Sequence, residues 1–129
     1  MAYRICVTWC GFGVWWARVI CGIRYEVTGI EVKDGLHLKS VVNYVGRNTV
    51  LLSAEAATHP AFAGYEHIIV NKEEEYAGNT LWINDTLITP LGYPDTLAKL
   101  QRLGMPIIEL DTSEFRKMDG GLTCLSLRF

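Results

Sequence analysis

The sequence contains no run of basic residues, and this absence limits the partners that the protein can bind. Its 12 Lys and Arg residues are outnumbered by 14 Asp and Glu residues, and the formal net charge is −2. Electrostatic binding to nucleic acid requires a clustered positive face. We therefore expect no nucleic-acid partner.

A long uninterrupted apolar segment is also missing. The most apolar stretch covers residues 5–20, which is shorter than the roughly 20 residues of a membrane-spanning helix, and Arg18 interrupts its end. A single Arg precedes this stretch, and no Ala-x-Ala cleavage pattern follows it. We therefore expect neither a membrane anchor nor a signal peptide.

Cysteine is scarce after the first 21 residues. Cys6, Cys10 and Cys21 lie close together, and only Cys124 lies beyond them. Such a distribution cannot form a disulfide framework across the chain, so we expect free thiols in a reducing cytoplasm. The three early cysteines also lack a nearby His as the fourth ligand of a zinc site, and we expect no metal.

What the sequence has in excess is apolar residues. They make up 50% of the 129 residues, and the mean hydropathy is +0.15. The length fits one domain, and a small domain normally needs more polar cover because its surface is large relative to its volume. The excess indicates burial against a partner, a second copy or a further part of the same fold.

Secondary-structure patterns become regular after about residue 24. The preceding segment, residues 1–24, is rich in Cys and Trp and has no clear period. Turn residues and alternating apolar positions predict the later strands, and Pro94 and Gly104 bracket the clearest helix. The predicted strands span residues 25–32, 36–45, 49–53, 67–71, 80–83, 86–89, 106–110 and 122–129. Predicted helices cover residues 54–62, where Pro60 limits the helix, and 95–103, and residues 112–118 form a connection or single turn.

These elements recur along the chain. Paired strands begin near Leu36, Leu81 and Leu122, at separations of about 45 and 41 residues. A strand–hairpin–helix unit of this length cannot bury its apolar face alone. The chain holds about two and a half such units, so we predict an α+β fold that is part of a ring, formed by residues 25–129.

Two side chains could carry chemistry. Cys124 on the predicted closing strand shares a face with Ser126 and Arg128, and His37 shares a face with Lys39 and Asn43. Each has an ordinary alternative: a lone Cys is often a buried structural residue, and a lone His is often a structural one. Equivalent strands of a ring converge on its axis, so residues 87 positions apart could meet in one thiol–imidazole site.

The motifs Leu36-His37-Leu38-Lys39-Ser40 and Leu122-Thr123-Cys124, with the order of elements between them, resemble the C-terminal half of dimethylargininase (dimethylarginine dimethylaminohydrolase). The resemblance covers about residues 25–129. It implies a partial α/β propeller, cut from a five-bladed ring of the guanidino-group-modifying, amidinotransferase-like superfamily. It also implies that His37 is the catalytic acid/base, that Cys124 is the nucleophile, and that Met118 offers its backbone carbonyl to the substrate.

The activity implied by the resemblance is hydrolysis of a guanidinium C–N bond in arginine or methylated arginine. Cys124 attacks the guanidinium carbon, His37 protonates the departing amine, and water then releases citrulline from a covalent thiouronium. No metal or organic cofactor is required. Relatives that are amidinotransferases or arginine deiminases use the same thiol chemistry, so the resemblance leaves them open.

The resemblance also implies that something is missing. The family's substrate-binding carboxylates lie in an N-terminal half that this sequence does not contain, and Arg4, Arg18 and Arg24 do not match the family's substrate-binding Arg. Glu73–Glu75 is a charge run of the kind that usually forms a solvated face. We therefore expect an incomplete enzyme that self-associates or needs a complementing N-terminal half, with residues 1–24 of separate origin. The alternative is a non-catalytic propeller fragment that acts as an interaction module.

Overall fold

The structure, a computed structural model, describes residues 4–8, 26–30 and 38–126. The chain divides into two compact units, Met1–Leu38 and Lys39–Phe129. In the first unit β1 (Arg4–Thr8) pairs in parallel with β2 (Glu26–Ile30). The strand predicted over residues 25–32 is therefore confirmed. A strand also lies in the early segment, where the sequence showed no clear period.

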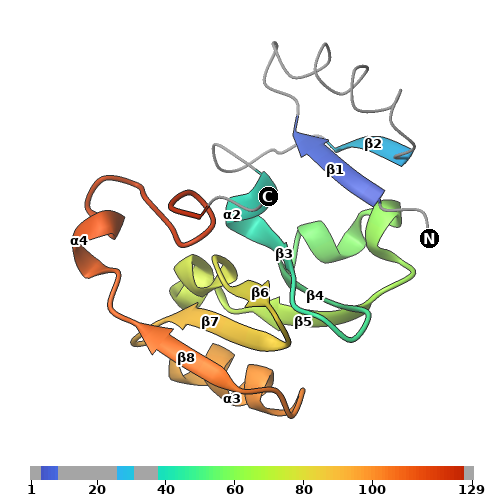
Figure 1. Ribbon diagram of the computed structural model, residues 1–129. Helices are drawn as coiled ribbons and strands as arrows, with labels where there is room; N and C mark the ends of the chain where they lie inside the picture. Colours follow the sequence, from blue (N-terminus) through green and yellow to red (C-terminus); the bar gives the residue numbers. More distant parts are fainter. Residues whose placement is uncertain (1–3, 9–25, 31–37, 127–129) are drawn as a thin grey trace. The chain divides into compact units, whose positions relative to one another are not determined.

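The second unit contains two three-stranded sheets built on one plan (Figure 1). In each sheet the first two strands form an antiparallel hairpin, and the third strand joins the second in parallel. The first sheet consists of β3 (Val42–Tyr44), β4 (Thr49–Ser53) and β5 (Glu66–Val70), and the second of β6 (Leu81–Ile83), β7 (Thr86–Pro90) and β8 (Ile107–Leu110). The predicted α+β class is confirmed, and the predicted unit occurs twice.

Both hairpins turn where the sequence predicted. Gly46, Arg47 and Asn48 all have positive φ angles (86°, 48° and 56°), as do Asn84 and Asp85 (48° and 57°). Asn, Asp and Gly tolerate this left-handed backbone better than other residues, and such turns match the twist of paired strands.

The connections within the two sheets differ in regularity. The predicted helix over residues 54–62 is instead two 3-10 turns, because Pro60 starts a new turn after His59. The helix predicted over 95–103 is confirmed as α3 (Pro94–Gln101), which contacts β5 and the 3-10 segment η3 (Lys72–Gly78). None of the helices among the described residues is long and apolar enough to cross a membrane. The helical segments are η1 (Ala56–Thr58), η2 (Pro60–Phe62), η3 (Lys72–Gly78), α3 (Pro94–Gln101) and α4 (Ser113–Arg116).

The strand predicted over residues 36–45 is wrong in its first part. Residues 38–41 form one helical turn, α2 (Leu38–Val41), and only β3 is extended. The side-chain amide of Asn43 donates to the carbonyl of Lys39 at 2.7 Å, so a carbonyl at the end of this turn has a side-chain partner four residues away. Residues 36 and 37 lie outside the described residues.

The closing strand predicted over residues 122–129 is also wrong for its described part. The amides of Cys124 and Leu125 both donate to the carbonyl of Gly121, at 2.9 and 3.1 Å, so the chain turns here. The predicted sharing of a face by Cys124 and Ser126 depended on that strand and has no basis in the structure. Residues 127–129 lie outside the described residues.

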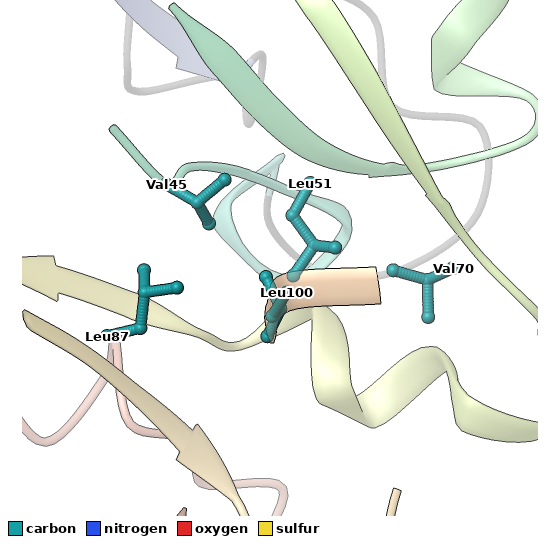
Figure 2. Packing of buried hydrophobic residues seen from close by; sticks show 5 residues of the cluster. All are labelled: Val45, Leu51, Val70, Leu87 and Leu100. Carbon is teal, nitrogen blue, oxygen red and sulfur yellow. The ribbon is translucent and has the colours of Figure 1, made fainter. Parts of the chain in front are cut away.

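The core of the second unit joins the two sheets. Leu51 and Val70 from the first sheet pack in one cluster with Val45, Leu87 and Leu100 (Figure 2). Four of these side chains are fully buried, and β4 contributes an almost continuously buried strand. Such burial on both faces is typical of a strand that runs parallel to a neighbour and is covered by helices.

The acidic run is only partly the solvated face that we expected. Glu73 and Glu75 are exposed, but Glu74 is half-buried at the start of α3. Its carboxylate accepts hydrogen bonds from the amides of Asp95 and Thr96 at 3.1 and 2.7 Å. These amides have no partner within the helix, so Glu74 caps α3 from another element. Partial burial opposes ionisation, but these hydrogen bonds outweigh it and lower the pKa of Glu74.

Replacing Glu74 with Gln should flatten the acid side of the stability profile. Because the pKa of Glu74 is lower in the folded chain than its ordinary value of 4.5, ionised Glu74 favours folding. This contribution is fully present above about pH 4.5 and is lost as the pH falls through the folded pKa. Thermal unfolding measured from pH 3 to 7 tests this. Glu73→Gln, an exposed neighbour, is the control, and equal profiles for the two variants would contradict the assignment.

Candidate active site

Cys124 is an exposed free thiol on the turn that follows α4. The turn is closed by the carbonyl of Gly121, which accepts from two successive amides, of Cys124 and Leu125. Cys124 is therefore not the buried structural cysteine that the sequence left open as its alternative. The thiol is accessible to a small molecule from solvent.

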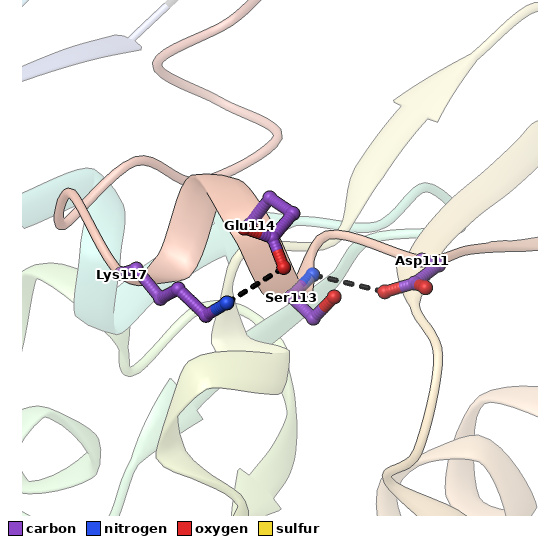
Figure 3. Close-up of polar contacts among 4 residues, drawn as sticks. All are labelled: Asp111, Ser113, Glu114 and Lys117. Carbon is purple, nitrogen blue, oxygen red and sulfur yellow. Dashed lines mark hydrogen bonds and ion pairs between the residues drawn. The ribbon is translucent and has the colours of Figure 1, made fainter.

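The approach to this turn begins at α4 (Figure 3). Asp111 accepts a hydrogen bond from the amide of Ser113 at 2.9 Å, and Lys117 pairs with Glu114 at 2.7 Å. The hydrogen bonds from Ser113 lower the pKa of Asp111, and the Lys117–Glu114 pair is exposed and contributes little to stability. The Asp111 bond marks the start of α4, and the Lys117–Glu114 pair lies along the helix up to the first residue of the loop.

Met118 lies in the loop between α4 and the Cys124 turn. Its amide and that of Gly120 both donate to the carbonyl of Phe115, at 3.0 and 2.9 Å. Asp119 between them has a positive φ of 56°, which gives the loop its tight bend. The Met118 side chain is 77% exposed, so this residue is not part of the core.

Two side chains from the region of η3 hold this loop. The hydroxyl of Tyr76 donates to the carbonyl of Gly120 at 2.7 Å, and the hydroxyl of Thr123 donates to the side-chain oxygen of Asn79 at 2.8 Å. Each contact joins residues 44 positions apart in the sequence. Asn79 is buried, so the position of the Cys124 turn is set from inside the fold.

An aromatic and cationic cluster supports Tyr76. The guanidinium of Arg116 lies 5.2 Å from the centre of the Tyr76 ring and donates to the hydroxyl of Tyr93 at 2.9 Å. Burial raises the pKa of Tyr93, although the charge of Arg116 opposes this, so the hydroxyl stays neutral and accepts from Arg116. The cluster keeps Tyr76 in place to bind Gly120.

The segment that follows His37 is bonded to the residue next to Asn79. Asn43 donates both to the carbonyl of Lys39 and to the carbonyl of Gly78, at 2.7 and 2.5 Å. Thus Lys39, two positions after His37, and Thr123, one position before Cys124, are tied to adjacent residues, Gly78 and Asn79. His37 itself lies outside the described residues, so its distance from Cys124 stays a prediction.

Metal ligands do not gather within the described ranges. Residues 4–8, 26–30 and 38–126 contain no group of three or more His, Cys, Asp or Glu side chains arranged to hold an ion. Of the three early cysteines, Cys10 and Cys21 lie outside those ranges. The chemistry of the described site is that of a thiol, hydroxyls, amides and backbone carbonyls.

The anchors of the loop could not be named from the sequence. Tyr76 and Asn79 showed no period or motif, Asn43 was noted only for sharing a face with His37, and nothing in a single sequence indicates that an Asn is buried. The one available clue is that Asn79 ends a polar stretch and precedes the predicted strand at residues 80–83. Their importance becomes visible only through contacts across 35 to 44 positions.

The fold is that of enzymes that modify guanidino groups. A solved amidinotransferase from Microseira wollei superposes with a TM-score of 0.79, covering 98% of this chain and 44% of that chain. At 14% identity this likeness shows the fold alone. No protein-family model matches the chain.

Within this fold the chain is similar to dimethylarginine dimethylaminohydrolase. The enzyme of that name from Pseudomonas aeruginosa is 44% identical over 100 residues, which is 78% of this chain and 39% of that protein. Its solved structure, a Cys-to-Ser variant complexed with citrulline, superposes with a TM-score of 0.91 at 34% identity. It covers 100% of this chain and 53% of that chain. The resemblance indicated by the motifs is therefore confirmed.

A second solved dimethylarginine dimethylaminohydrolase is a His-to-Gly variant in an adduct with S-methyl-L-thiocitrulline. It also has a TM-score of 0.91, at 34% identity, and covers 98% of this chain and 52% of that chain. The chain thus spans about half the length of the solved structures that it matches. A separate match of 30 residues, 57% identical, is to a 1-acyl-sn-glycerol-3-phosphate acyltransferase of Pseudomonas aeruginosa and covers 22% of this chain.

Proposed function

We propose that this chain carries the nucleophile-bearing part of a hydrolase that cleaves the guanidinium C–N bond of methylated arginine and yields citrulline. The observation that carries this proposal is the exposed Cys124 thiol on an anchored turn, within a fold shared with dimethylarginine dimethylaminohydrolases. Citrulline is bound to one of these solved enzymes, and a thiocitrulline compound forms an adduct with another. Both ligands have the chemistry expected of this reaction.

The pairing of His37 with Cys124 has independent numerical support. The substituted His of one solved enzyme and the substituted Cys of the other are numbered 87 positions apart. His37 and Cys124 are separated by the same 87 positions. We therefore assign His37 as acid/base and Cys124 as nucleophile.

The reaction proceeds in two halves. The thiolate of Cys124 bonds to the guanidinium carbon, and His37 protonates the methylamine as its C–N bond breaks, which leaves a covalent thiouronium. His37 then accepts a proton from water, the water oxygen bonds to the same carbon, and the C–S bond breaks. The products are methylamine or dimethylamine and citrulline, and the thiolate is restored. Every step uses protein groups and water, so the proposal needs no metal and no organic cofactor.

Met118 has a separate role in this proposal. Its backbone carbonyl accepts a hydrogen bond from the cationic substrate, as the resemblance implies. In support, the bend at Asp119 gives the loop a defined backbone next to the Cys124 turn. The side chain of Met118 is exposed and is free to contact the substrate or another chain.

We further propose that the chain is one part of a five-bladed propeller and that hydrolysis needs the part that its relatives possess beyond it. The two repeated sheets support the blade assignment, and the coverage of about half of each solved relative supports the division. Exposed apolar side chains on β5 and β8 offer a surface for self-association or for a complementing half, which light scattering tests. They include Ile69, Ile108 and Leu110.

In this proposal residues 1–24 have a separate coding origin from residues 25–129, even though β1 pairs with β2 across that boundary. The hydrolase match covers 100 of the 129 residues, and a match of 30 residues is to an acyltransferase. Two different relatives are expected if two coding segments have been joined. The DNA sequence that surrounds the gene tests this: one continuous hydrolase reading frame through residue 1 would contradict it.

A haloacetamidine probe tests the proposed nucleophile. Its cationic amidine resembles guanidinium, and a thiolate displaces its halide to form a stable thioether. We expect Cys124 to be labelled faster than the other three cysteines and His37→Ala to slow labelling about tenfold near pH 7, because a neighbouring His increases the thiolate fraction. Peptide mass spectrometry locates the adduct, and Cys124→Ser is the control. Citrulline release is expected only when the missing part of the enzyme is supplied.

The alternatives make different predictions in the same assay. A deiminase or amidinotransferase relative would also show an activated Cys124. The deiminase would release ammonia together with citrulline from unmethylated arginine, and the amidinotransferase would pass the amidino group to an acceptor amine instead of water. An interaction module, which the exposed apolar side chains of β8 favour, would show a thiol of ordinary reactivity with or without other chains. Labelling of Cys124 at the rate of an unfolded cysteine would therefore reject the proposed hydrolase.

A further inference from the structure

A buried carboxamide lies directly beneath the turn that carries Cys124. Asn79 is only 6% exposed, and its side-chain oxygen accepts the hydroxyl of Thr123 at 2.8 Å. The same carboxamide lies against the α-carbon of Gly121, so closely that a methyl group there would collide with it. Asn79 thus contacts both the residue before the thiol and the residue whose carbonyl closes the turn.

The backbone that presents Asn79 is itself fixed. The preceding residue, Gly78, accepts a hydrogen bond from Asn43, which also binds Lys39. Gly78 also lies close to this segment, because an added Cβ would lie 3.2 Å from the carbonyl oxygen of Ser40, a tight contact that would require a small shift. The Gly78–Asn79 pair is therefore held by the segment that follows His37, and it in turn holds the Cys124 turn.

We propose that Asn79 is a positioning residue for Cys124, acting through the hydroxyl of Thr123 and the close contact with Gly121. The inference rests on the proposed function, since it assigns a role in placing the nucleophile. The amides of Cys124 and Leu125 are satisfied within the turn itself, so they do not attach it to the core. The bond from Thr123 to Asn79 provides that attachment, together with the Tyr76 bond to Gly120.

Two substitutions remove the same bond from opposite ends. Asn79→Ala deletes the acceptor, and Thr123→Val deletes the donor without changing side-chain size or the buried carboxamide. Because Thr123 is only partly buried, the second variant keeps the test valid if the first fails to fold. Thr123→Ser retains the hydroxyl and should restore wild-type behaviour. Thr58→Val, which removes a surface hydroxyl bonded to the carbonyl of Glu55, is the matched control.

The measurement is the rate of Cys124 labelling by chloroacetamidine as a function of pH in the full-length chain, with thermal unfolding recorded in parallel. We expect Asn79→Ala and Thr123→Val each to lower the high-pH plateau about three- to tenfold, the effect of one hydrogen bond. The double variant should lose no more than Asn79→Ala alone, because Asn79→Ala already removes the hydrogen bond that Thr123→Val removes. Thr123→Ser and Thr58→Val should stay within about twofold of the wild type.

A merely structural role would lower the unfolding temperature and leave the plateau of the folded protein unchanged. Unchanged plateaus in Thr123→Val, or additive losses in the double variant, would overturn the positioning role alone if wild-type Cys124 is activated. A wild-type Cys124 that reacts no faster than an unfolded cysteine would overturn the proposed function and this inference together. The two failures are thus distinguishable in one data set.

Discussion

Replacing Gly121 with Ala is expected to suppress the reactivity of Cys124 and to destabilise the folded chain. A Cβ at this position would lie 2.6 Å from the side-chain carbon of the buried Asn79, so either the turn or the Asn79 side chain must shift. Overpacking of this kind costs about 1–3 kcal/mol. If the turn moves to relieve the collision, the bond from Thr123 to Asn79 is lost as well.

The effect on labelling should be larger than that of removing the hydrogen bond alone. Each 1.4 kcal/mol corresponds to about a tenfold change, so a collision of this size could lower the labelling rate up to about a hundredfold. Gly64→Ala is the control, since nothing lies within 4 Å of the added methyl group there. It should leave labelling unchanged and stability equal or raised by less than about 1 kcal/mol. Normal labelling of Cys124 in Gly121→Ala would show that the turn does not need this close packing.

The parts of the fold that could be predicted are those fixed by local chemistry. Gly46, Asn48, Asn84 and Asp85 mark the hairpins because Gly, Asn and Asp accept positive φ angles better than other residues. Pro94 and the regular spacing of leucines after it mark α3 because both depend only on neighbours in the sequence. The repetition of one unit also follows from these local features, since each unit contains a hairpin and a parallel return strand.

The parts that could not be predicted depend on contacts between distant residues. The stretch around Leu38 alternates like a strand, but the Asn43 bond to Lys39 and Gly78 ends a helical turn there. The stretch after Leu122 looks like a strand for the same reason, but Thr123 and Gly121 pack on Asn79 and bend it. Apolar alternation over a few residues does not distinguish a strand from a turn.

In the candidate site, too, some residues could be named from the sequence and others only from contacts between distant residues. Cys124 and Met118 could be named from the sequence because the family motif contains them, and the structure places both on one loop after α4. Glu74 could not be separated from its two acidic neighbours, because its role depends on the start of α3 lying beside it. The composition shows that residues 73–75 are acidic, but only the folded structure shows that Glu74 is the residue that caps α3.

Replacing Leu51 with Ala should give the largest loss of stability. Leu51 is fully buried on β4 and packs in the cluster that joins the first sheet to Leu87 of the second sheet and Leu100 of α3. Truncation of such a leucine typically costs about 2–5 kcal/mol because it leaves a cavity. Ile69→Ala on the adjacent strand β5 is the control: its side chain is 43% exposed, so its loss should cost less than about 1 kcal/mol.

The effect of Leu51→Ala on Cys124 shows whether the core also holds the turn that carries the thiol. Asn43 lies on β3 of the first sheet, and Asn79 lies two residues before β6 of the second sheet. The core that joins the sheets therefore also supports Asn43 and Asn79. At each urea concentration, Cys124 is labelled in parallel by chloroacetamidine and by a neutral alkylating reagent, and the ratio of the two rates is its amidine preference. In Leu51→Ala the amidine preference of Cys124 should disappear at the same urea concentration at which the fold is lost, and this concentration should be lower than in the wild type. If the preference disappeared well before unfolding, the turn would be held independently of this core, and the cluster around Leu51 would have no part in placing the thiol.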